Sequence, residues 1–378
     1  MLFTRFALLL HNMSKTVVFH IISRFDLGGA EQVALNIASS PSTEFEHHII
    51  EVIRGRAAYT RVFIDEMRRR GIHYHRSPVG AVNFHYVFER LAAVLFPLWA
   101  IWIFMRRRPQ VLHSHTEVPD MAVWCLLRLF PHLFRQTKLV RTIHNTRLWT
   151  GLPSTGRRFE RFVGQRGINV AISPSVFHNY ADTYAQAPVI IYNGVPRVPQ
   201  KPWPGIVEGR INILFAGRLE PQKGITKLIE IVSSLADDSR YHFHIIGDGS
   251  LRPDVEKALS RQTNVTLSAP VYGLSAYLAS FDALLMPSEF EGLSIMSIEA
   301  SLEALPVICN RCPGLADTLP PGWPLGVTGN DINEYMHIFC DVLPTADLAA
   351  FGRKSRRFAS ANFGLARMQT RYEEIYMR

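Results

Sequence analysis

The chain is organised around the stretch from Met286 to Ala300, which reads Met-Pro-Ser-Glu-Phe-Glu-Gly-Leu-Ser-Ile-Met-Ser-Ile-Glu-Ala. An apolar run from Ala283 to Met286 leads into it and is typical of a buried strand. Pro287 and Gly292 then favour a turn, and the residues from Leu293 onward predict a helix. The first turn of such a helix presents N–H groups that can bind an anion.

Two glutamates lie in this stretch, and their spacing limits what they can do together. Glu291 lies at the mouth of the predicted helix and Glu299 follows eight residues later. On an ideal helix this spacing is about 12 Å along the axis and roughly 80° around it. The two carboxylates therefore cannot share one metal ion or one proton, but they can hold two parts of one elongated ligand. A structural alternative is a first-turn dipole partner at Glu291 and a solvated surface residue at Glu299.

The side chains around these glutamates leave one side of the helix nearly bare, at Ser294, Ser297, Ala300, Ser301 and Ala304. Here the chain resembles the retaining nucleotide-sugar glycosyltransferases of family 4, which have the two-domain GT-B fold. Their signature, Glu-Gly…Glu-Ala followed by Pro-Val-Ile, matches Glu291-Gly292, Glu299-Ala300 and Pro306-Val307-Ile308. The resemblance implies that Glu291 contacts the donor sugar and Glu299 the ribose hydroxyls. It also places Gly292, Leu293 and Ser294 along the donor.

Length and composition set the limits for the whole chain. Its 378 residues suit two domains of ordinary size, and 47% apolar residues are typical of a globular protein. Four cysteines are too few for a disulfide framework, and the lone Cys309-x-x-Cys312 is a weak signal for zinc or redox chemistry. No apolar run is expected to reach the ~18–20 residues of a membrane-spanning helix. The apolar first twelve residues lack a small-residue cleavage site, so we expect no signal peptide, and Met13 is an alternative start.

Charge is distributed unevenly along the chain. Through Pro196 there are 23 Lys and Arg against 12 Asp and Glu, whereas the remainder has 18 against 20. The entire basic excess thus lies in the first half. This asymmetry indicates an anionic partner for that half, either a membrane surface or a nucleic acid.

A glycine pair follows the first predicted strand, Val17 to Ile22. Gly28 and Gly29 lie between this strand and a helix that runs through Ala38, and they let backbone amides approach a phosphate. A tight turn is the structural alternative, because the three-glycine spacing of the dinucleotide fingerprint is missing. The sequence is similar to the Gly-Gly-Ala-Glu of the family, where this loop faces the donor phosphates and the acceptor.

Further strands and an apolar helix are expected in the first half. The expected strands are His48–Ile53, Ile72–Ser77, Val111–His115, Lys138–Ile143, Asn169–Ser173 and Pro188–Tyr192, with a helix at Arg61–Arg70. Leu91 to Met105 is apolar on every face and ends in Arg106-Arg107-Arg108, which suits a buried crossover helix or one that dips into a bilayer.

Histidines end two of these predicted strands, at His113, His115 and His144. Ligands of open parallel sheets bind at the carboxyl ends of strands, although histidines there are also often structural. All three are candidates to orient the sugar or the acceptor hydroxyl, and we favour His144.

The second half opens after a segment rich in proline and glycine, Arg197 to Arg210, that is typical of a linker. The strand Ile211–Ala216 leads into Gly217-Arg218-Leu219-Glu220-Pro221-Gln222-Lys223-Gly224 and a helix. Strand, glycine, two cations and helix suit a pyrophosphate site, with Arg218 and Lys223 offsetting its charge. The structural alternative is a basic surface loop, but the order resembles the family's Gly-Arg-Leu…Lys-Gly. Gly247, after the strand His242–Ile246, is expected to line the base pocket.

These patterns predict an α/β chain of GT-B fold, with two Rossmann-like doubly wound domains facing a cleft. Residues 1–196 would form the acceptor-binding domain and residues 197–364 the donor-binding domain. The helix in residues 365–378 would pack back on the first domain.

The predicted activity is retaining transfer of a sugar from a nucleoside-diphosphate sugar, a UDP-sugar, to a lipid-linked or surface-polysaccharide acceptor. We expect no cofactor and no metal, because the metal-binding Asp-x-Asp pattern is absent from the sequence. Glu291, His144, Arg218 and Lys223 are the catalytic candidates, and the two cations would stabilise the leaving diphosphate. We expect an anionic membrane surface as partner, no nucleic acid, and a cytoplasmic, peripheral location on the inner face of the membrane.

Two other classes remain open on the sequence alone. A nonhydrolysing UDP-sugar epimerase shares the fold and would use Glu117 and Asp120 as acid and base. A basic nucleic-acid-binding protein would explain the charge of the first half but not the donor-type motifs of the second.

Overall fold

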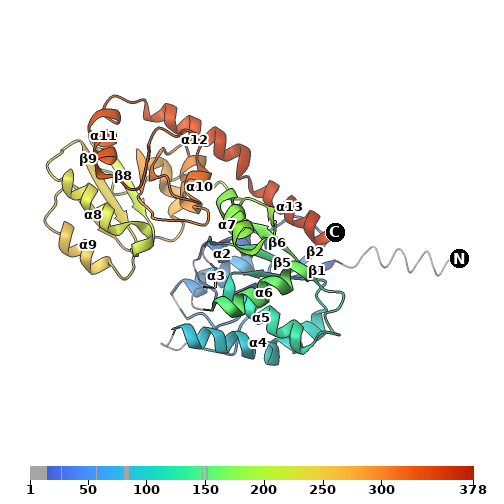
Figure 1. The fold of residues 1–378 in the computed structure, drawn as a ribbon. Helices are drawn as coiled ribbons and strands as arrows, with labels where there is room; N and C mark the ends of the chain where they lie inside the picture. The colour runs from blue at the N-terminus through green and yellow to red at the C-terminus, as the bar shows by residue number, and fades with distance from the viewer. Residues whose placement is uncertain (1–14, 27, 57, 81–84, 147, 150–151) are drawn as a thin grey trace. The chain divides into compact units, whose positions relative to one another are not determined.

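The computed structural model contains two parallel sheets with helices around them (Figure 1). It describes residues 15–378 except 27, 57, 81–84, 147 and 150–151. The chain forms two compact units. The first comprises the residues up to Ile172 together with Val176–Gly194 and Ala366–Arg378, and the second comprises Ser173–Ser175 and Val195–Leu365. The chain thus passes into the second unit at Val195, two residues before the predicted boundary.

All strands of the first sheet are parallel, in the order β3-β2-β1-β4-β5-β6-β7. They are β1 (Thr16–Ile22), β2 (Phe45–Glu51), β3 (His73–His75), β4 (Val111–His115), β5 (Lys138–Ile143), β6 (Gly167–Ala171) and β7 (Val189–Ile190). The chain builds outward in one direction from β1 and then in the other from β4. The carboxyl ends of β1 and β4 are therefore the topological switch point, where ligands of such sheets bind.

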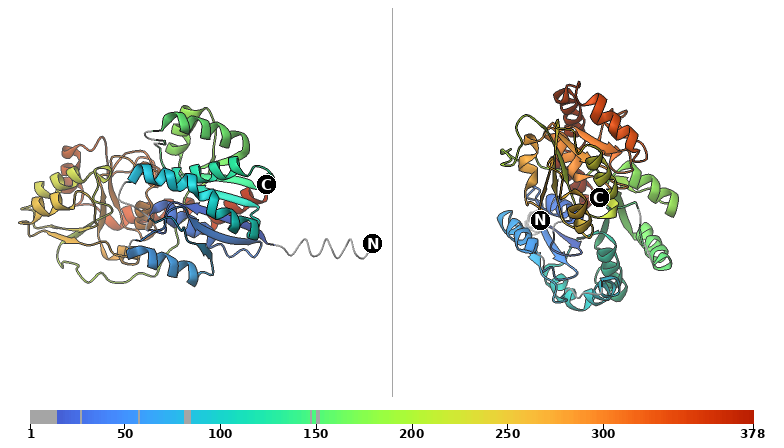
Figure 2. Two further views of the ribbon diagram at one scale, coloured as in Figure 1. Left: turned by 90° about the horizontal axis from the view of Figure 1, so that it is seen from below. Right: turned by 90° about the vertical axis from the view of Figure 1, so that its left-hand side faces the viewer.

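Helices cover both faces of this sheet, as the views in Figure 2 also show. They are α2 (Gly29–Ala38), α3 (Ala58–Arg69), α4 (His85–Arg107), α5 (Glu117–Leu129), α6 (Pro153–Arg166), α7 (Pro174–Tyr184) and α13 (Leu365–Met377). Phe19 and Leu112 pack in one buried core with residues of α4, α5 and α6. Because side chains alternate along a strand, the neighbouring His20 and His113 face the other side of the sheet. There Tyr376 of α13 donates or accepts a hydrogen bond with His113 at 2.7 Å.

Five strands of the first sheet, β1, β2, β3, β6 and β7, differ from the predicted ranges, and β2 and β3 show the physical reason. β2 begins at Phe45, three residues before the predicted His48, because Phe45 is buried and pairs with Thr16. β3 is shorter than the predicted Ile72–Ser77, since Ser77 leaves the ladder and its hydroxyl donates to the carbonyl of Val52. All five differences concern strand ends, and the order of elements is as predicted.

The second sheet has the order β10-β9-β8-β11-β12-β13, again all parallel. Its strands are β8 (Ile211–Ala216), β9 (Tyr241–Ile246), β10 (Val265–Ser268), β11 (Ala283–Met286), β12 (Val307–Asn310) and β13 (Gly326–Val327). Its helices are α8 (Ile225–Ser234), α9 (Arg252–Leu259), α10 (Ile295–Leu302), α11 (Ile332–His337) and α12 (Leu348–Asn362), with the short turn η1 (Pro221–Lys223) before α8. The switch point of this sheet lies at the carboxyl ends of β8 and β11.

Helix α4 corrects the expectation that no segment is long enough to cross a membrane. Its 20 residues from Phe88 to Arg107 meet the length and composition of a span, but only 39% of the most apolar window is buried. Phe96 and Phe104 lie in the core, whereas Leu98 and Trp102 are 61% and 72% exposed. One face of the helix therefore packs in the core of the first unit, and the opposite face exposes apolar side chains.

Candidate functional site

A buried ion pair joins the two loops at the switch point of the second sheet. The Nζ atom of Lys223, in the turn that follows β8, lies 2.6 Å from Oε1 of Glu291, in the loop after β11. The hydroxyl of Ser288 donates to the same carboxylate oxygen at 2.9 Å. The side chains of Glu291 and Lys223 are 8% and 19% exposed. Burying a carboxylate is tolerable only when it is paired, so Lys223 and Ser288 compensate for the burial of Glu291.

Glu291 was predicted at the mouth of a helix that starts near Leu293, and it lies in the loop before α10. Helix α10 begins at Ile295 and not near Leu293, because Ser294 caps it with a hydroxyl that accepts from the N–H of Ser297 at 3.3 Å. The 12 Å helical spacing predicted between Glu291 and Glu299 therefore does not apply. Instead, the N–H of Glu291 donates to the carbonyl of Pro313 at 3.1 Å, which fixes the turn before the helix.

The rest of the predicted donor segment is held by its backbone. The N–H of Ser294 donates to the carbonyl of Gly314 at 3.2 Å, and the side chain of Leu293 is buried. Gly314 has a φ of +77°, and a Cβ there would lie 2.2 Å from the carbonyl oxygen of Glu291. Only glycine allows this approach, so Gly314 supports the loop of Glu291 and Gly292 from behind.

Two further glycines show close packing on the β8 side. Gly224 has a φ of +67°, and a Cβ there would lie 1.8 Å from the carbonyl oxygen of Pro287. A Cβ on Gly247 would lie 2.0 Å from the carbonyl oxygen of Gly217. The sequence predicted Gly247 as a base-pocket residue, and the structure shows that its first requirement is close packing against the loop that begins at Gly217.

The two remaining polar candidates of this unit differ in environment. Glu299 is partly buried on α10, and burial raises its pKa to about 7. Among the residues that the structure describes, its carboxyl group has no hydrogen-bond or ion-pair partner. Hydroxyl groups that donate to this carboxylate would favour its charged form. Arg218 follows β8 and is exposed, and within the described part of the chain it makes no ion pair.

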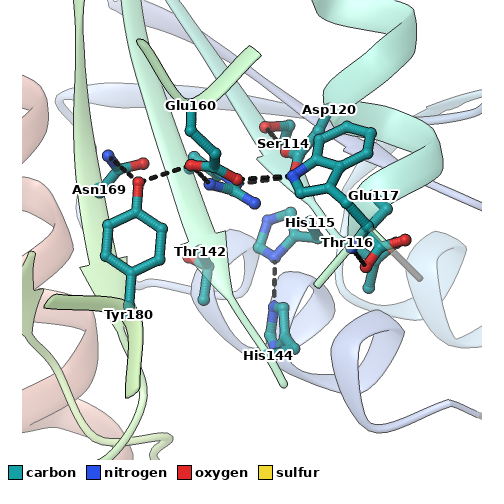
Figure 3. Close-up of polar contacts among 12 residues, drawn as sticks. Ser114, His115, Thr116, Glu117, Asp120, Thr142, His144, Glu160, Asn169 and Tyr180 are labelled. Atoms are coloured by element: carbon teal, nitrogen blue, oxygen red, sulfur yellow. Dashed lines mark hydrogen bonds and ion pairs between the residues drawn. The ribbon is translucent and has the colours of Figure 1, made fainter. Parts of the chain in front are cut away.

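A cavity of about 340 Å³ lies in the first unit at the carboxyl ends of β4 and β5. Its lining includes Thr116, Glu117, Arg141, His144, Asn145 and Trp149. Figure 3 shows Thr116, Glu117 and His144 among these residues. Nε2 of His144 lies 3.2 Å from Nδ1 of His115. Burial, and then the charge of Arg141, lower the pKa of His144 to about 3, so the imidazole is neutral near pH 7. A neutral imidazole can donate a hydrogen bond to a ligand or accept one from it.

A buried charge network supports this cavity, and sequence reasoning missed most of it. Arg141 contacts Asp120 through Nε and Glu160 through Nη1, both at 2.7 Å. Glu160 also accepts from Trp149 Nε1 and Tyr180 Oη, each at 2.6 Å. The available signal was Arg141 in the middle of the predicted strand β5, because a charge in a buried strand requires partners.

The switch point of the first sheet carries a strained residue. Thr116 has φ 76° and ψ 170°, a region that costs a non-glycine residue on the order of 1–3 kcal/mol. Its hydroxyl lies 3.0 Å from that of Ser23, which follows β1. This contact ties the loop after β1 to the start of α5, beside the cavity.

The predicted glycine pair lies at the start of α2. Gly28 caps the helix in an extended conformation and Gly29 is its first residue, with nothing within 4 Å of the position of a Cβ. Residue 27, just before the pair, lies outside the described residues. The structure therefore shows open space beside Gly29.

Comparisons with known proteins identify the family. The family model described as "Glycosyltransferase Family 4" matches residues 27–197, and the one described as "Glycosyl transferases group 1" matches residues 210–343. The chain belongs to the family 4-like glycosyltransferases. This confirms the resemblance drawn from Glu291, Glu299 and the loop of Arg218 and Lys223.

Solved structures confirm the predicted fold of this family 4-like protein. A glycosyltransferase from Rickettsia africae superimposes with a TM-score of 0.74 at 18% identity, covering 96% of this chain and 98% of the other. Anabaena HepE in complex with UDP and glucose gives a TM-score of 0.73 at 16% identity, covering 96% and 99%. At these identities the similarity shows the GT-B fold alone.

Curated relatives match over shorter segments. An uncharacterised 41.2 kDa protein in the cps region of Klebsiella pneumoniae is 33% identical over 177 residues, 44% of this chain and 46% of that protein. A 2-deoxystreptamine glucosyltransferase of Streptomyces kanamyceticus is 36% identical over 118 residues, 30% of each chain. The chain spans about half the length of the first curated relatives it matches.

The two alternative classes are not favoured. The epimerase hypothesis required Glu117 and Asp120 as acid and base, but both carboxylates are already engaged. Asp120 is paired with Arg141, and Glu117 accepts from the N–H of Trp149 at 2.5 Å. The nucleic-acid hypothesis does not account for the family matches over both halves of the chain.

Proposed function

We propose that this family 4-like protein transfers a sugar from a UDP-sugar to a lipid-linked or surface-polysaccharide acceptor, with retention of anomeric configuration and without a metal ion. The observation that carries the proposal is the buried contact of Lys223 and Ser288 with Glu291 at the switch point of the second sheet. It brings a carboxylate and a cation from two different loops to the place where the fold binds ligands.

The donor would lie along the second unit. Glu291, fixed by its two partners, would accept hydrogen bonds from hydroxyls of the donor sugar, and Glu299 would accept them from the ribose. Lys223 and the exposed Arg218 would offset the charge that develops on the leaving diphosphate. UDP is supported by relatives of the same fold, since HepE has been solved in complex with UDP-glucose.

Retention is supported by the family resemblance. The acceptor oxygen would attack the anomeric carbon from the face on which the diphosphate departs. Its proton would pass to an oxygen of the leaving diphosphate, so that no enzyme base is consumed. His144 would orient the sugar or the acceptor hydroxyl by a hydrogen bond. Since Arg218 and Lys223 supply positive charge, this mechanism requires no divalent cation.

The acceptor proposal is supported by an exposed apolar stripe on helix α4. Its residues are Leu91, Val94, Leu98, Trp102 and Met105, all at least 44% exposed, and the exposed Arg106, Arg107 and Arg108 follow them. Basic residues near an anionic leaflet contribute about 1 kcal/mol each, and the apolar side chains would insert shallowly at the interface. We therefore propose peripheral attachment to the cytoplasmic face of the membrane, where lipid-linked saccharides are accessible.

Calorimetric titration with UDP-, GDP- and ADP-sugars tests the donor. We expect heat of binding with UDP-sugars, and the same heat in excess EDTA. No heat with any of the three nucleotides would contradict a glycosyltransferase and leave a binding protein.

The reaction itself is tested by incubating the protein with the UDP-sugar that binds best and a lipid-linked saccharide. The anomeric proton coupling of the product, measured by NMR, reports the stereochemistry. An inverted linkage would refute the retaining mechanism, and rescue of an EDTA-inactivated reaction by Mg²⁺ or Mn²⁺ would refute metal independence.

A further inference from the structure

Four imidazoles form a continuous row across the first sheet. Nδ1 of His47 on β2 lies 3.1 Å from Nε2 of His20 on β1. Nδ1 of His20 lies 3.2 Å from Nε2 of His115 on β4, whose Nδ1 lies 3.2 Å from Nε2 of His144. Figure 3 shows the last of these contacts at the edge of the cavity. The row thus runs from the interior of the sheet to the one member that lines the cavity.

Three hydrogen bonds join the four imidazoles of the row. Burial holds the pKa of His20 and His115 well below the usual value and lowers that of His47 to about 4. All four rings, His144 included, are therefore neutral, and each has one N–H and one bare nitrogen. Three contacts use three N–H groups and three bare nitrogens. One N–H remains, at Nδ1 of His144 or at Nε2 of His47, and the choice fixes the tautomer of every ring.

The buried end of the row decides between these two arrangements. Nε2 of His47 is buried and has no hydrogen-bond partner among the described residues. A proton there would be an unpaired buried N–H donor, which native structures rarely contain. With the opposite polarity, Nε2 of His47 is a bare acceptor and the remaining N–H is on His144. All four rings then carry their proton on Nδ1.

We propose that the histidine row fixes His144 as a neutral hydrogen-bond donor at Nδ1, directed at an oxygen of a saccharide ligand in the cavity. In this arrangement His144 does not accept the proton of the acceptor hydroxyl. His47, His20 and His115 are positioning residues, because they act on the ligand only through His144. The ligand class rests on the proposed function, whereas the tautomer of His144 does not.

A neighbouring histidine lies outside the row and serves as a control. The rings of His113 and His115 lie 4.1 Å apart, but the nitrogens of His113 contact Tyr376 Oη and Thr142 Oγ1, both at 2.7 Å. Nitrogens of His20, His113 and His115 lie within 4.8 Å of one another, close enough to suggest a metal ion. Both ring nitrogens of His20 and of His115 already lie at hydrogen-bond distance from another imidazole. These contacts favour a hydrogen-bonded row over a metal site.

The test is the ¹⁵N NMR spectrum of the full chain labelled at histidine, with the signals of His144 assigned by loss in His144→Gln. A protonated Nδ1 and a bare Nε2 on His144 are expected. Protonation of His144 at Nε2, an imidazolium at neutral pH, or one equivalent of zinc in the purified protein would each overturn the proposal. This measurement needs no substrate, so its failure is separate from a failure to observe glycosyl transfer.

A pair of variants then tests the coupling. In His115→Gln the glutamine amide can either donate to His144 or accept from it. His144 is then no longer restricted to one tautomer, and its spectrum should show a mixture of the Nδ1–H and Nε2–H forms. The transfer rate falls by roughly tenfold at most, the value of one net hydrogen bond, while the donor Kd stays constant. His113→Gln, on the same buried strand, leaves the His144 signals unchanged. Equal effects of the two variants on those signals would refute the row.

Discussion

The buried pair of Lys223 and Glu291 allows a quantitative test of the donor site. The side chain of Glu291 is 8% exposed in this structure. In Lys223→Met its carboxylate keeps the hydrogen bond from Ser288 but loses its cation. Removing one partner of a buried pair costs about 3–5 kcal/mol, because the other charge is left uncompensated. We expect a loss of this size in the free energy of unfolding, measured by urea denaturation of the second unit's transition.

A double-mutant cycle separates the pair from its surroundings. Lys223→Met leaves the charge of Glu291 without a partner, and Glu291→Gln removes that charge. The double variant should therefore lose clearly less free energy of unfolding than the sum of the losses of the two single variants. Lys227→Met is the matched control, since Lys227 pairs with the exposed Glu230 and such pairs contribute roughly 0–1 kcal/mol. Additive losses in the cycle, or equal losses for Lys223→Met and Lys227→Met, would refute the reasoning.

Three further predictions concern binding and stability. Because the pKa of Glu299 is raised to about 7 and ribose hydroxyls favour the charged form, donor affinity by calorimetry should rise with pH through about 7 and level off above it; Glu299→Gln should remove this dependence, and an unchanged pH profile would contradict the assignment. Gly314→Ala should destabilise the protein by more than ~2 kcal/mol and weaken donor binding, because it adds a clash to a positive φ. Gly329→Ala, with a φ of +62° and open space, should cost only about 1 kcal/mol in thermal unfolding, and equal losses would argue against the close packing of Gly314. In vesicle flotation we expect binding to anionic but not neutral lipid, reversed by salt and weakened by Arg106/Arg107/Arg108→Ser; no binding at low salt would leave a soluble acceptor.

The fold was predictable where a glycine or a proline ends a buried apolar strand. β8 and β11 begin and end as predicted, because apolar runs stop at Gly217 and at Pro287. The start of β2 was misplaced because Glu46 and His47 interrupt its apolar pattern, although His47 is buried. Polar residues whose partners lie on distant strands carry no local sign that they belong to the core.

The sequence could propose candidate site residues but not the contacts between them. Local motifs identified Lys223 and Glu291, but the ion pair spans 68 residues and depends on which strands lie next to each other. The start of α10 was missed because the cap at Ser294 outweighs the apolar pattern that begins one residue earlier. The histidine row was found only in part, since His20 and His47 lie within strands and show no strand-end signal.

The cavity region was the hardest to predict. Arg141, Glu160 and Trp149 come from three separate segments, and none has a recognisable motif. Each of them is explained only by the others, because a buried charge must find its partners in the tertiary structure.

The position of α13 has a consequence for the order in which the protein folds during synthesis. Tyr372 and Tyr376 are fully buried against Thr142 and His113, so the chain must return to the first unit after the second has been made. Until α13 has emerged from the ribosome, the face of the sheet that carries His113 lacks its cover. The first half of the chain therefore cannot complete its core by itself, and nascent chains that stop short of α13 should expose this face to chaperones and proteases.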